Sequence, residues 1–224
     1  ITVYRILYLT PEALTKHKLT FMENHKSIAR IVFDEVHCVS SWGHDFRPCY
    51  SRLGELRSKF PNTPFCGFTA TAPRKVKKDV ISCLQLKEPI IFEGKYFRSN
   101  LILHVSKRPN KDSFRTILKS LLTTKLDGSG ILYCTSRKSC EEYSEYLSNY
   151  TTALPYHAGM AMKKRKLTQD QWMNGSVKVI CATIAFGMGI DKLDTRWIIH
   201  ANLPKCMTSY YQEIGRAGRD GKRA

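Results

Sequence analysis

Short apolar runs alternate along the chain with stretches in which apolar residues recur every three or four positions. Within the runs, apolar residues follow one another without polar ones between them, which is typical of strands that are covered on both faces. The runs predict six strands, at residues 5–9, 29–33, 64–68, 130–134, 177–182 and 196–201.

The stretches between these runs have the apolar spacing of helices. Leu53, Leu56 and Phe60 share one helical face, and Pro61 ends that pattern. Asn-Gly at 174–175 predicts the end of another helix. Three further faces are formed by Val76, Val80 and Leu84, by Phe114, Ile117, Leu118 and Leu121, and by Cys140, Tyr143 and Leu147.

This alternation predicts an α/β fold with parallel sheets. The stretch 93–111 interrupts the rhythm, because it is basic and lacks helical periodicity. We therefore place a boundary near 93–98 and predict one α/β lobe over residues 1–95 and a second over 96–224. Because the chain starts inside an apolar run, we expect the first lobe to be incomplete at its N-terminus.

The charge balance favours a polyanionic partner. Lys and Arg total 36 and Asp and Glu total 19, so the net charge is 36 − 19 = +17. A solvated basic surface is the alternative. No apolar run is long enough to cross a bilayer and no signal peptide is evident, so we expect a soluble intracellular protein. None of the eight cysteines forms a C-x-x-C pair, which favours buried thiols in a reducing compartment.

Two carboxylates follow the second apolar run directly. Asp34 and Glu35 stand at the carboxyl end of the predicted strand 29–33, where open α/β sheets bind ligands, and His37 comes two residues later. In phosphoryl transfer to water, one carboxylate holds Mg²⁺ and a second activates the attacking water. The pair fits those two tasks, although many strands end in solvated acids.

A second chemical pattern lies near the C-terminus. On a helix, Gln212, Arg216 and Arg219 would share one face. Gly215 and Gly218 lie among them, and each helical glycine costs roughly 1 kcal/mol relative to alanine. Two guanidiniums aimed at one place suit the charge on a transferred phosphoryl group, whereas a solvated basic helix would not need the glycines.

Several segments together resemble the superfamily 2 helicases, and the RecQ family of DNA helicases in particular, over essentially the whole chain. The most discriminating is CVSSWGHDFRPCY at 38–50, which resembles the aromatic-rich loop of RecQ proteins that DEAD-box RNA helicases lack. HANLPKCMTSYYQE at 200–213 is most similar to the Bloom-syndrome-helicase branch. The other segments resemble helicase motifs: YLTPE (8–12) motif Ib, DEVH (34–37) motif II, FTATA (68–72) motif III, GILYCTSRKSCE (130–141) motif IV with YHAG (156–159) after it, VICATIAFGMGIDK (179–192) motif V and YYQEIGRAGRDG (210–221) motif VI.

The resemblance implies two RecA-like lobes and an ATP-dependent 3′→5′ DNA helicase of repair and recombination. It implies ATP and Mg²⁺ as cofactors, and single-stranded and forked or junction DNA as partners. Zinc is implied only for a domain downstream of this chain. The expected location is the nucleus in a eukaryote and the cytoplasm in a bacterium.

The resemblance also implies roles at the nucleotide. Asp34 would hold Mg²⁺, Glu35 would activate water and meet the metal through it, and His37 would link the nucleotide site to motifs III and VI. Arg216 and Arg219 would reach the γ-phosphate, with Arg219 as the arginine finger. Further residues implied at the catalytic and nucleotide sites are Gln212, Gly189 and Asp191.

A separate set of residues would bind DNA. Trp42 and Phe46 can stack on unpaired bases, and Arg47 can hold a phosphate. DNA on this loop would reposition Asp34 and Glu35 and so couple strand binding to ATP turnover; the alternative is that both rings pack in the core. The residues implied for DNA binding are Trp42, His44, Phe46, Arg47, Ser136, Arg137, His157 and Thr183.

The phosphate-binding loop G-x-x-x-x-G-K-[ST] does not occur in these residues. We therefore expect an internal piece of a longer helicase that binds ATP poorly by itself. A non-catalytic nucleic-acid-binding or strand-annealing module is the competing hypothesis. An RNA helicase of the DEAH type is a third, which SSWGHDFRP at 40–48 disfavours.

Overall fold

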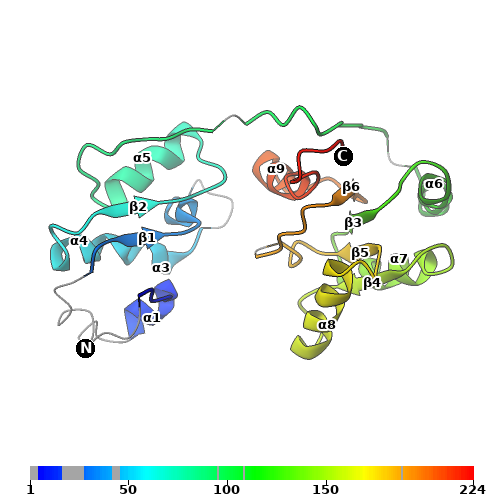
Figure 1. Ribbon diagram of the computed structural model, residues 1–224, viewed down its shortest axis with the longest axis horizontal. Coiled ribbons are helices and arrows are strands. Elements are labelled where there is room, and N and C mark those ends of the chain that lie inside the picture. Colours follow the sequence, from blue (N-terminus) through cyan, green and yellow to red (C-terminus); the bar gives the residue numbers. More distant parts are fainter. Residues whose placement is uncertain (1–4, 17–27, 42–45, 95, 108, 188) are drawn as a thin grey trace. The chain divides into compact units, whose positions relative to one another are not determined.

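A computed structural model describes residues 5–16, 28–41, 46–94, 96–107, 109–187 and 189–224 (Figure 1). Contacts divide the chain into two compact units, Ile1–Glu93 and Gly94–Ala224. Each unit has its own parallel sheet with helices around it, which confirms the predicted α/β class. No helix in these residues combines the length and apolar character of a bilayer span.

The first unit is built on two parallel strands. β1 (Ile31–Phe33) pairs with β2 (Phe65–Gly67), with Val32 opposite Cys66. Its core packs Phe33 and Val36 with apolar residues of the helices. The helical elements are α1 (Pro11–Lys16), the 3-10 helix η1 (Val36–Val39), α3 (Pro48–Ser51), the 3-10 helix η2 (Arg52–Glu55), α4 (Leu56–Lys59) and α5 (Arg74–Cys83).

The strand predicted at 5–9 is wrong. Residues 5–10 have no strand structure, and the side chains of Ile6, Leu7 and Tyr8 are exposed. Among the described residues β1 and β2 pair only with each other, so this apolar run has no strand beside it to hydrogen-bond with. An apolar run forms a strand only where a neighbour completes its backbone hydrogen bonds.

The second unit holds a four-stranded parallel sheet in the order β4-β5-β3-β6 (Figure 1). Pro155 lies within β4, and proline is tolerated there because β4 is at the edge of the described sheet. The strands are β3 (Ser129–Tyr133), β4 (Ala153–Tyr156), β5 (Val179–Ala182) and β6 (Thr195–His200), and the helices are α6 (Lys111–Thr124), α7 (Arg137–Leu147), α8 (Met162–Met173) and α9 (Met207–Ile214).

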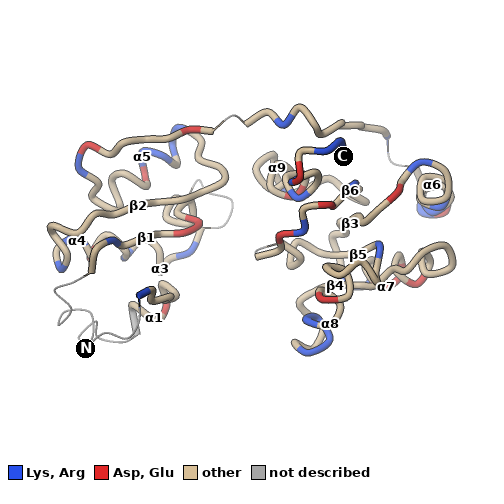
Figure 2. Tube along the Cα trace, viewed as in Figure 1, with Lys and Arg blue, Asp and Glu red and all other residues tan. Residues whose placement is uncertain are grey.

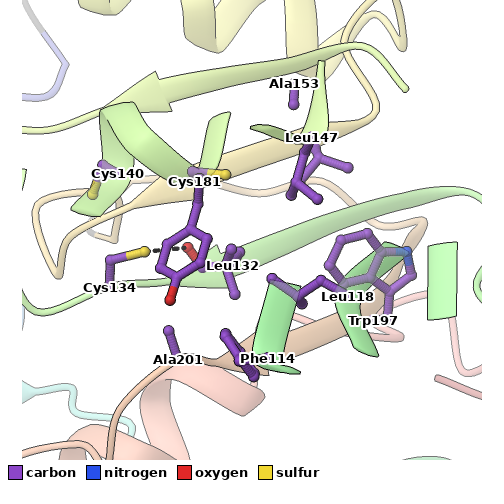
Figure 3. Packing of buried hydrophobic residues seen from close by; sticks show 12 residues of the cluster. Phe114, Leu118, Leu132, Cys134, Cys140, Leu147, Ala153, Cys181, Trp197 and Ala201 are labelled. Atoms are coloured by element: carbon purple, nitrogen blue, oxygen red, sulfur yellow. Dashed lines mark hydrogen bonds between the residues drawn. The ribbon is translucent and has the colours of Figure 1, made fainter. Parts of the chain in front are cut away.

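Helices α6 and α7 contribute to a core against one side of this sheet. Figure 3 shows Leu118 of α6 beside Trp197 of β6, with Leu132 of β3 in the same cluster. Cys181 of β5 is also buried in this cluster, and its burial raises the pKa of the thiol. All eight cysteines are free thiols, and four of them are buried as small apolar side chains.

Candidate functional site

The acidic pair lies at the carboxyl end of β1. Asp34 is exposed, and its Oδ1 accepts a hydrogen bond from the Glu35 N–H at 2.9 Å. Glu35 has φ 49° and ψ 41°, a left-handed conformation that costs a non-glycine residue roughly 1 kcal/mol or more. This conformation turns the chain out of the strand and into η1. Both carboxylates therefore stand at the carboxyl edge of the sheet, as the sequence predicts.

His37 connects this turn to the segment after β2. The imidazole is buried at 2% exposure, and its Nδ1 lies 3.2 Å from Glu35 Oε2 and 2.9 Å from Thr69 Oγ1. Thr69 Oγ1 in turn donates to the carbonyl oxygen of Thr71 at 3.0 Å. The predicted connection between His37 and the FTATA segment therefore exists as a chain of contacts. The predicted connection to residues 210–221 involves the other unit and stays a prediction.

The aromatic loop is closed at its base by a backbone hydrogen bond. The N–H of Arg47 donates to the carbonyl oxygen of Cys38 in η1 at 3.1 Å. The hydroxyl of Tyr50 donates to the backbone carbonyl of Asp34 at 3.3 Å. Phe46 is 44% exposed, which argues against a core role for its ring. Trp42 and His44 lie outside the described residues.

The predicted helical face carrying Gln212, Arg216 and Arg219 is wrong. Helix α9 ends at Ile214, so only Gln212 is on it. Gly215 caps the helix, and Gly218 has φ 56°, which lies outside the helical region. The two arginines therefore lie on a loop, which we call the arginine loop (residues 215–221).

Arg219 contacts the segment that follows β5. Its Nη1 lies 2.6 Å from Asp191 Oδ1 and donates to the carbonyl oxygen of Ile190 at 3.2 Å. A Cβ at position 187 would lie 3.1 Å from Arg216 Nη2, so Gly187 leaves room for that guanidinium. The structure thus brings the predicted nucleotide residues Arg219 and Asp191 together. Gly189 of the same segment has φ 75°, which glycine adopts readily.

Arg216 lies against buried polar groups. Its Nε is buried and has no hydrogen-bond partner in the part of the chain that the structure describes. The hydroxyl of Tyr133 donates to the carbonyl oxygen of Phe186 at 3.0 Å, and burial raises the pKa of Tyr133 to about 12 against the opposing charge of Arg216. His200 stacks on Tyr133 at 5.4 Å between ring centroids, and its Nε2 lies 2.7 Å from Glu213 Oε2.

The predicted DNA-backbone residues of the second unit share one edge of its sheet. Residues 133, 156 and 182 are register partners at the carboxyl ends of β3, β4 and β5. Ser136 and Arg137 follow β3, His157 follows β4, and Thr183 follows β5. The four residues therefore lie along the same edge.

Some of these side chains also make local bonds. Ser136 caps α7 by accepting from the N–H of Ser139 at 3.1 Å, and Thr183 Oγ1 accepts from the N–H of Ala185 at 3.4 Å. His157 is buried, and its Nε2 lies 3.3 Å from a Glu141 oxygen. These bonds position Ser136, Thr183 and His157 at the edge of the sheet.

Sequence reasoning missed Arg98 and Asn100. Both donate hydrogen bonds to backbone carbonyls of the arginine loop, more than 115 residues away along the chain. In the sequence, the only signal at these two residues is that they lie in the basic stretch 93–111, which lacks helical periodicity. A second missed feature is the run of four basic residues, 163–166, near the start of α8, where Figure 2 shows the charges gathered.

A magnesium ion fits the acidic pair. Among the described residues, no three or more His, Cys, Asp or Glu side chains are grouped to hold a metal. Mg²⁺ is usually bound by one or two carboxylates together with phosphate oxygens and water, so a complete protein cage is not required. The exposed carboxylate of Asp34 suits such a site. For ATP, the buried Nε of Arg216 is a donor suited to a phosphate oxygen.

Comparison with known proteins adds the following relationships. Residues 1–79 match the DEAD/DEAH box helicase family, and residues 113–221 match the helicase conserved C-terminal domain. The chain is 45% identical over 98% of its length to the ATP-dependent DNA helicase hus2/rqh1 of Schizosaccharomyces pombe, of which it spans 17%. It has the same identity and coverage with the RecQ-like DNA helicase BLM of Xenopus laevis. With the ATP-dependent DNA helicase Q-like 4B of Arabidopsis thaliana it shares 44% identity over 99% of the chain, which spans 20% of that protein.

Solved structures show the fold. Yeast Dbp5 bound to RNA and ADP BeF3 superposes with a TM-score of 0.70 at 18% identity, over 96% of this chain and 56% of that one. The Mycobacterium smegmatis helicase Lhr, bound to ssDNA and AMP-PNP, gives a TM-score of 0.61 at 20% identity, over 85% of this chain and 27% of that one. Both units therefore have the RecA-like fold of these structures.

Proposed function

The chain belongs to the RecQ family of DNA helicases, and on that premise we propose that it is part of the motor of an ATP-dependent DNA helicase. The family resemblance supports 3′→5′ polarity, a role in DNA repair and recombination, and a nuclear location in a eukaryote. The chain spans about a fifth or less of the named relatives, so the activity proposed is that of the whole gene product.

The observation that carries the proposal is the acidic pair at the end of β1, with His37 bonded to Thr69 behind it. We assign Asp34 to the metal and Glu35 to the attacking water, whose proton its carboxylate would accept. Bound Mg²⁺ supplies charge neutralisation at the β- and γ-phosphates. His37 lies 3.2 Å from Glu35 and thereby holds the direction of that carboxylate.

Two guanidiniums on one loop suit the developing charge of phosphoryl transfer. Arg216 has a buried Nε that is available to a phosphate oxygen. Arg219 is held by Asp191 and would exchange that carboxylate for the γ-phosphate when nucleotide is bound. Asp191 would then be available to the nucleotide, together with Gly189, and Gln212 would lie nearby on α9.

DNA would be bound by two sets of residues. Ser136, Arg137, His157 and Thr183 lie along one sheet edge and would follow the phosphate backbone. In the first unit, Trp42 and Phe46 would stack on bases beside His44 and Arg47. Because the base of that loop is bonded to η1, bases stacked on it would shift the turn that carries Asp34 and Glu35.

The proposal is tested with the full-length gene product and its Glu35→Gln variant. We expect DNA-stimulated ATP hydrolysis and unwinding in the unmodified protein, and a fall of at least about a hundredfold in kcat for the variant with DNA binding kept. Glu55→Gln is a matched control, because Glu55 is an exposed glutamate of the same unit, paired with Arg52.

The two competing hypotheses predict other outcomes. A non-catalytic binding or annealing module would bind single-stranded DNA without hydrolysing ATP. An RNA helicase would bind RNA more tightly than single-stranded DNA in direct competition. Either result would contradict the proposed function.

A further inference from the structure

We propose that Arg98 and Asn100 are positioning residues that fix the arginine loop, and so set where Arg216 and Arg219 point. The inference rests on the proposed function for its catalytic consequence. The hydrogen bonds between the segment at the start of the second unit and the arginine loop do not depend on the proposed function.

Arg98 donates to three backbone carbonyls of the arginine loop. Its Nη1 lies 3.2 Å from the carbonyl oxygen of Gly215, and its Nη2 lies 3.0 Å from that of Ala217 and 2.7 Å from that of Gly218. These carbonyls belong to the residues immediately before and after Arg216 and to the residue before Arg219. A shift of those peptide groups would therefore move both arginine side chains.

Asn100 reinforces the same place. Its Nδ2 donates to the carbonyl oxygen of Gly218 at 2.9 Å and to that of Lys222 at 2.8 Å. A Cβ at position 218 would lie 2.5 Å from this nitrogen, so a glycine is needed there for close approach as well as for its φ of 56°. The fit of Gly218 against Asn100 explains why one of the three glycines of the arginine loop occupies its position.

The rest of the segment follows the end of the chain. The N–H of Ile102 donates to the carbonyl oxygen of Ala224 at 2.9 Å, and the N–H of Ala224 donates to that of Asn100 at 3.0 Å. The hydroxyl of Tyr211 on α9 donates to the backbone carbonyl of Tyr96 at 2.5 Å. The segment 96–102 is thus hydrogen-bonded both to α9 and to the residues that follow α9.

An arginine suits this role better than a lysine. The carbonyls at and beyond a helix C-terminus carry partial negative charge and lack helical partners, so a cation there is favourable. A planar guanidinium can donate to several carbonyls in fixed directions, whereas an ammonium is a flexible point charge. Arg98→Lys should therefore keep the charge and lose the fixed geometry.

The segment 96–102 begins three residues after Glu93, where the first unit ends. Force or displacement that reaches it from that side would act directly on the loop carbonyls. Through Arg98 and Asn100, the positions of Arg216 and Arg219 would depend on the segment 96–102. The ion pair of Arg219 with Asp191 is a second contact that holds Arg219.

The first test is hydrogen exchange, resolved by peptide, in the full-length gene product. The N–H groups of Gly218, Asp220 and Gly221 are bonded to carbonyls in the structure. In Arg98→Ala we expect their exchange to rise by about tenfold or more, because local opening becomes easier. Asn100→Ala should show a smaller rise. Lys107→Ala removes a cation from an exposed position of the same connecting stretch and should change nothing.

Unchanged exchange in both Arg98→Ala and Arg98→Lys would overturn the inference. Using the lysine variant keeps the test valid where the alanine variant fails to fold. The exchange result does not depend on whether the protein hydrolyses ATP, so it decides the positioning claim even where the proposed function fails.

The second test is kinetic. For Arg98→Lys we expect kcat for DNA-stimulated ATP hydrolysis to fall about tenfold, with KM for ATP and DNA affinity within about twofold. In an Arg219→Ala background the same change should cost less than about threefold, because residues that act through one another are not additive. Full additivity, or a change confined to KM, in a protein whose unmodified form hydrolyses ATP would overturn the inference and leave the proposed function standing.

Discussion

His37 Nδ1 and Thr69 Oγ1 lie 2.9 Å apart, although the two residues are 32 positions apart in the sequence. This contact joins the turn after β1 to the segment after β2, which are adjacent in the sheet. A buried imidazole requires hydrogen-bond partners, and here one partner comes from the second segment. The turn that carries Asp34 and Glu35 is therefore fixed by a contact with the segment that follows β2.

Thr69→Val removes that hydroxyl and keeps the side-chain shape. We expect the free energy of unfolding to fall by about 1–3 kcal/mol, because the buried imidazole loses a partner. In the full-length protein, kcat for ATP hydrolysis should fall by about tenfold with KM nearly unchanged. Steady-state kinetics and urea unfolding measure the two effects. Thr63→Val, half-buried in the same unit, is the control, and an unchanged kcat in Thr69→Val would contradict the assignment.

Asp191→Asn separates catalysis from stability. The ion pair of Asp191 with Arg219 is partly exposed, with side-chain exposures of 70% and 32%, so the free energy of unfolding should change by less than about 1 kcal/mol. ATP hydrolysis should fall by about tenfold, because the bound nucleotide loses the carboxylate that becomes available to it when Arg219 moves to the γ-phosphate. Asp194→Asn removes a neighbouring exposed carboxylate, paired with Lys192, and should leave hydrolysis unchanged. A stability loss with full activity would assign Asp191 a purely structural role.

Tyr133 predicts a pH dependence of stability at the alkaline end. Burial raises its pKa to about 12, so the phenol stays neutral in the folded protein while it ionises at about pH 10 in the unfolded chain. The unfolded state then binds fewer protons, and stability falls as pH rises from about 10 to 12. Urea unfolding at pH 9 to 11.5 should show this fall, and Tyr133→Phe should reduce its slope. An identical slope in both proteins would contradict the burial of this phenol.

Gly130→Ala tests the packing of the second unit. A Cβ at this position would lie 2.1 Å from ring atoms of the buried Trp197, so β3 or the indole must move. We expect a loss of about 3 kcal/mol in the free energy of unfolding, at the upper end for overpacked cores. Gly94→Ala meets no atom within 4 Å and is the control. Thermal unfolding compares the two, and equal melting temperatures would mean that the close approach of Gly130 to Trp197 is wrong.

The strands of the second unit show what the sequence could predict. β3, β5 and β6 lie within a residue or two of the predicted runs, because strands of a parallel sheet that is covered on both faces read as nearly continuous apolar runs. β4 escaped prediction, since Pro155 interrupts it and only its edge position makes the proline acceptable. The run at 5–9 is apolar but forms no strand, because no neighbouring strand is present to complete its backbone hydrogen bonds among the described residues.

The site was predictable where it follows strand ends. Asp34, Glu35 and Thr183 could be placed at sheet edges because each comes directly after an apolar run. The arginine loop could not be predicted from the sequence. Gly215 and Gly218 are compatible with a continuing helix, but in the structure the helix ends at Gly215 and Gly218 has a left-handed φ. Arg98 could not be found either, since its partners are distant carbonyls that carry no sequence signal.

The central claim is that the aromatic loop and the acidic pair act together, and the direct measurement is DNA-stimulated ATP hydrolysis by Trp42→Ala in the full-length gene product. Basal hydrolysis should stay within about threefold of the unmodified protein. Loss of stacking on one ring, worth about 1–3 kcal/mol, should lower single-stranded DNA affinity by about fivefold or more, so stimulation is measured at saturating DNA. Phe92→Ala, an exposed aromatic of the same unit, is the control. The account predicts that stimulation by DNA is largely lost in Trp42→Ala and kept in Phe92→Ala. Full stimulation in Trp42→Ala would contradict it.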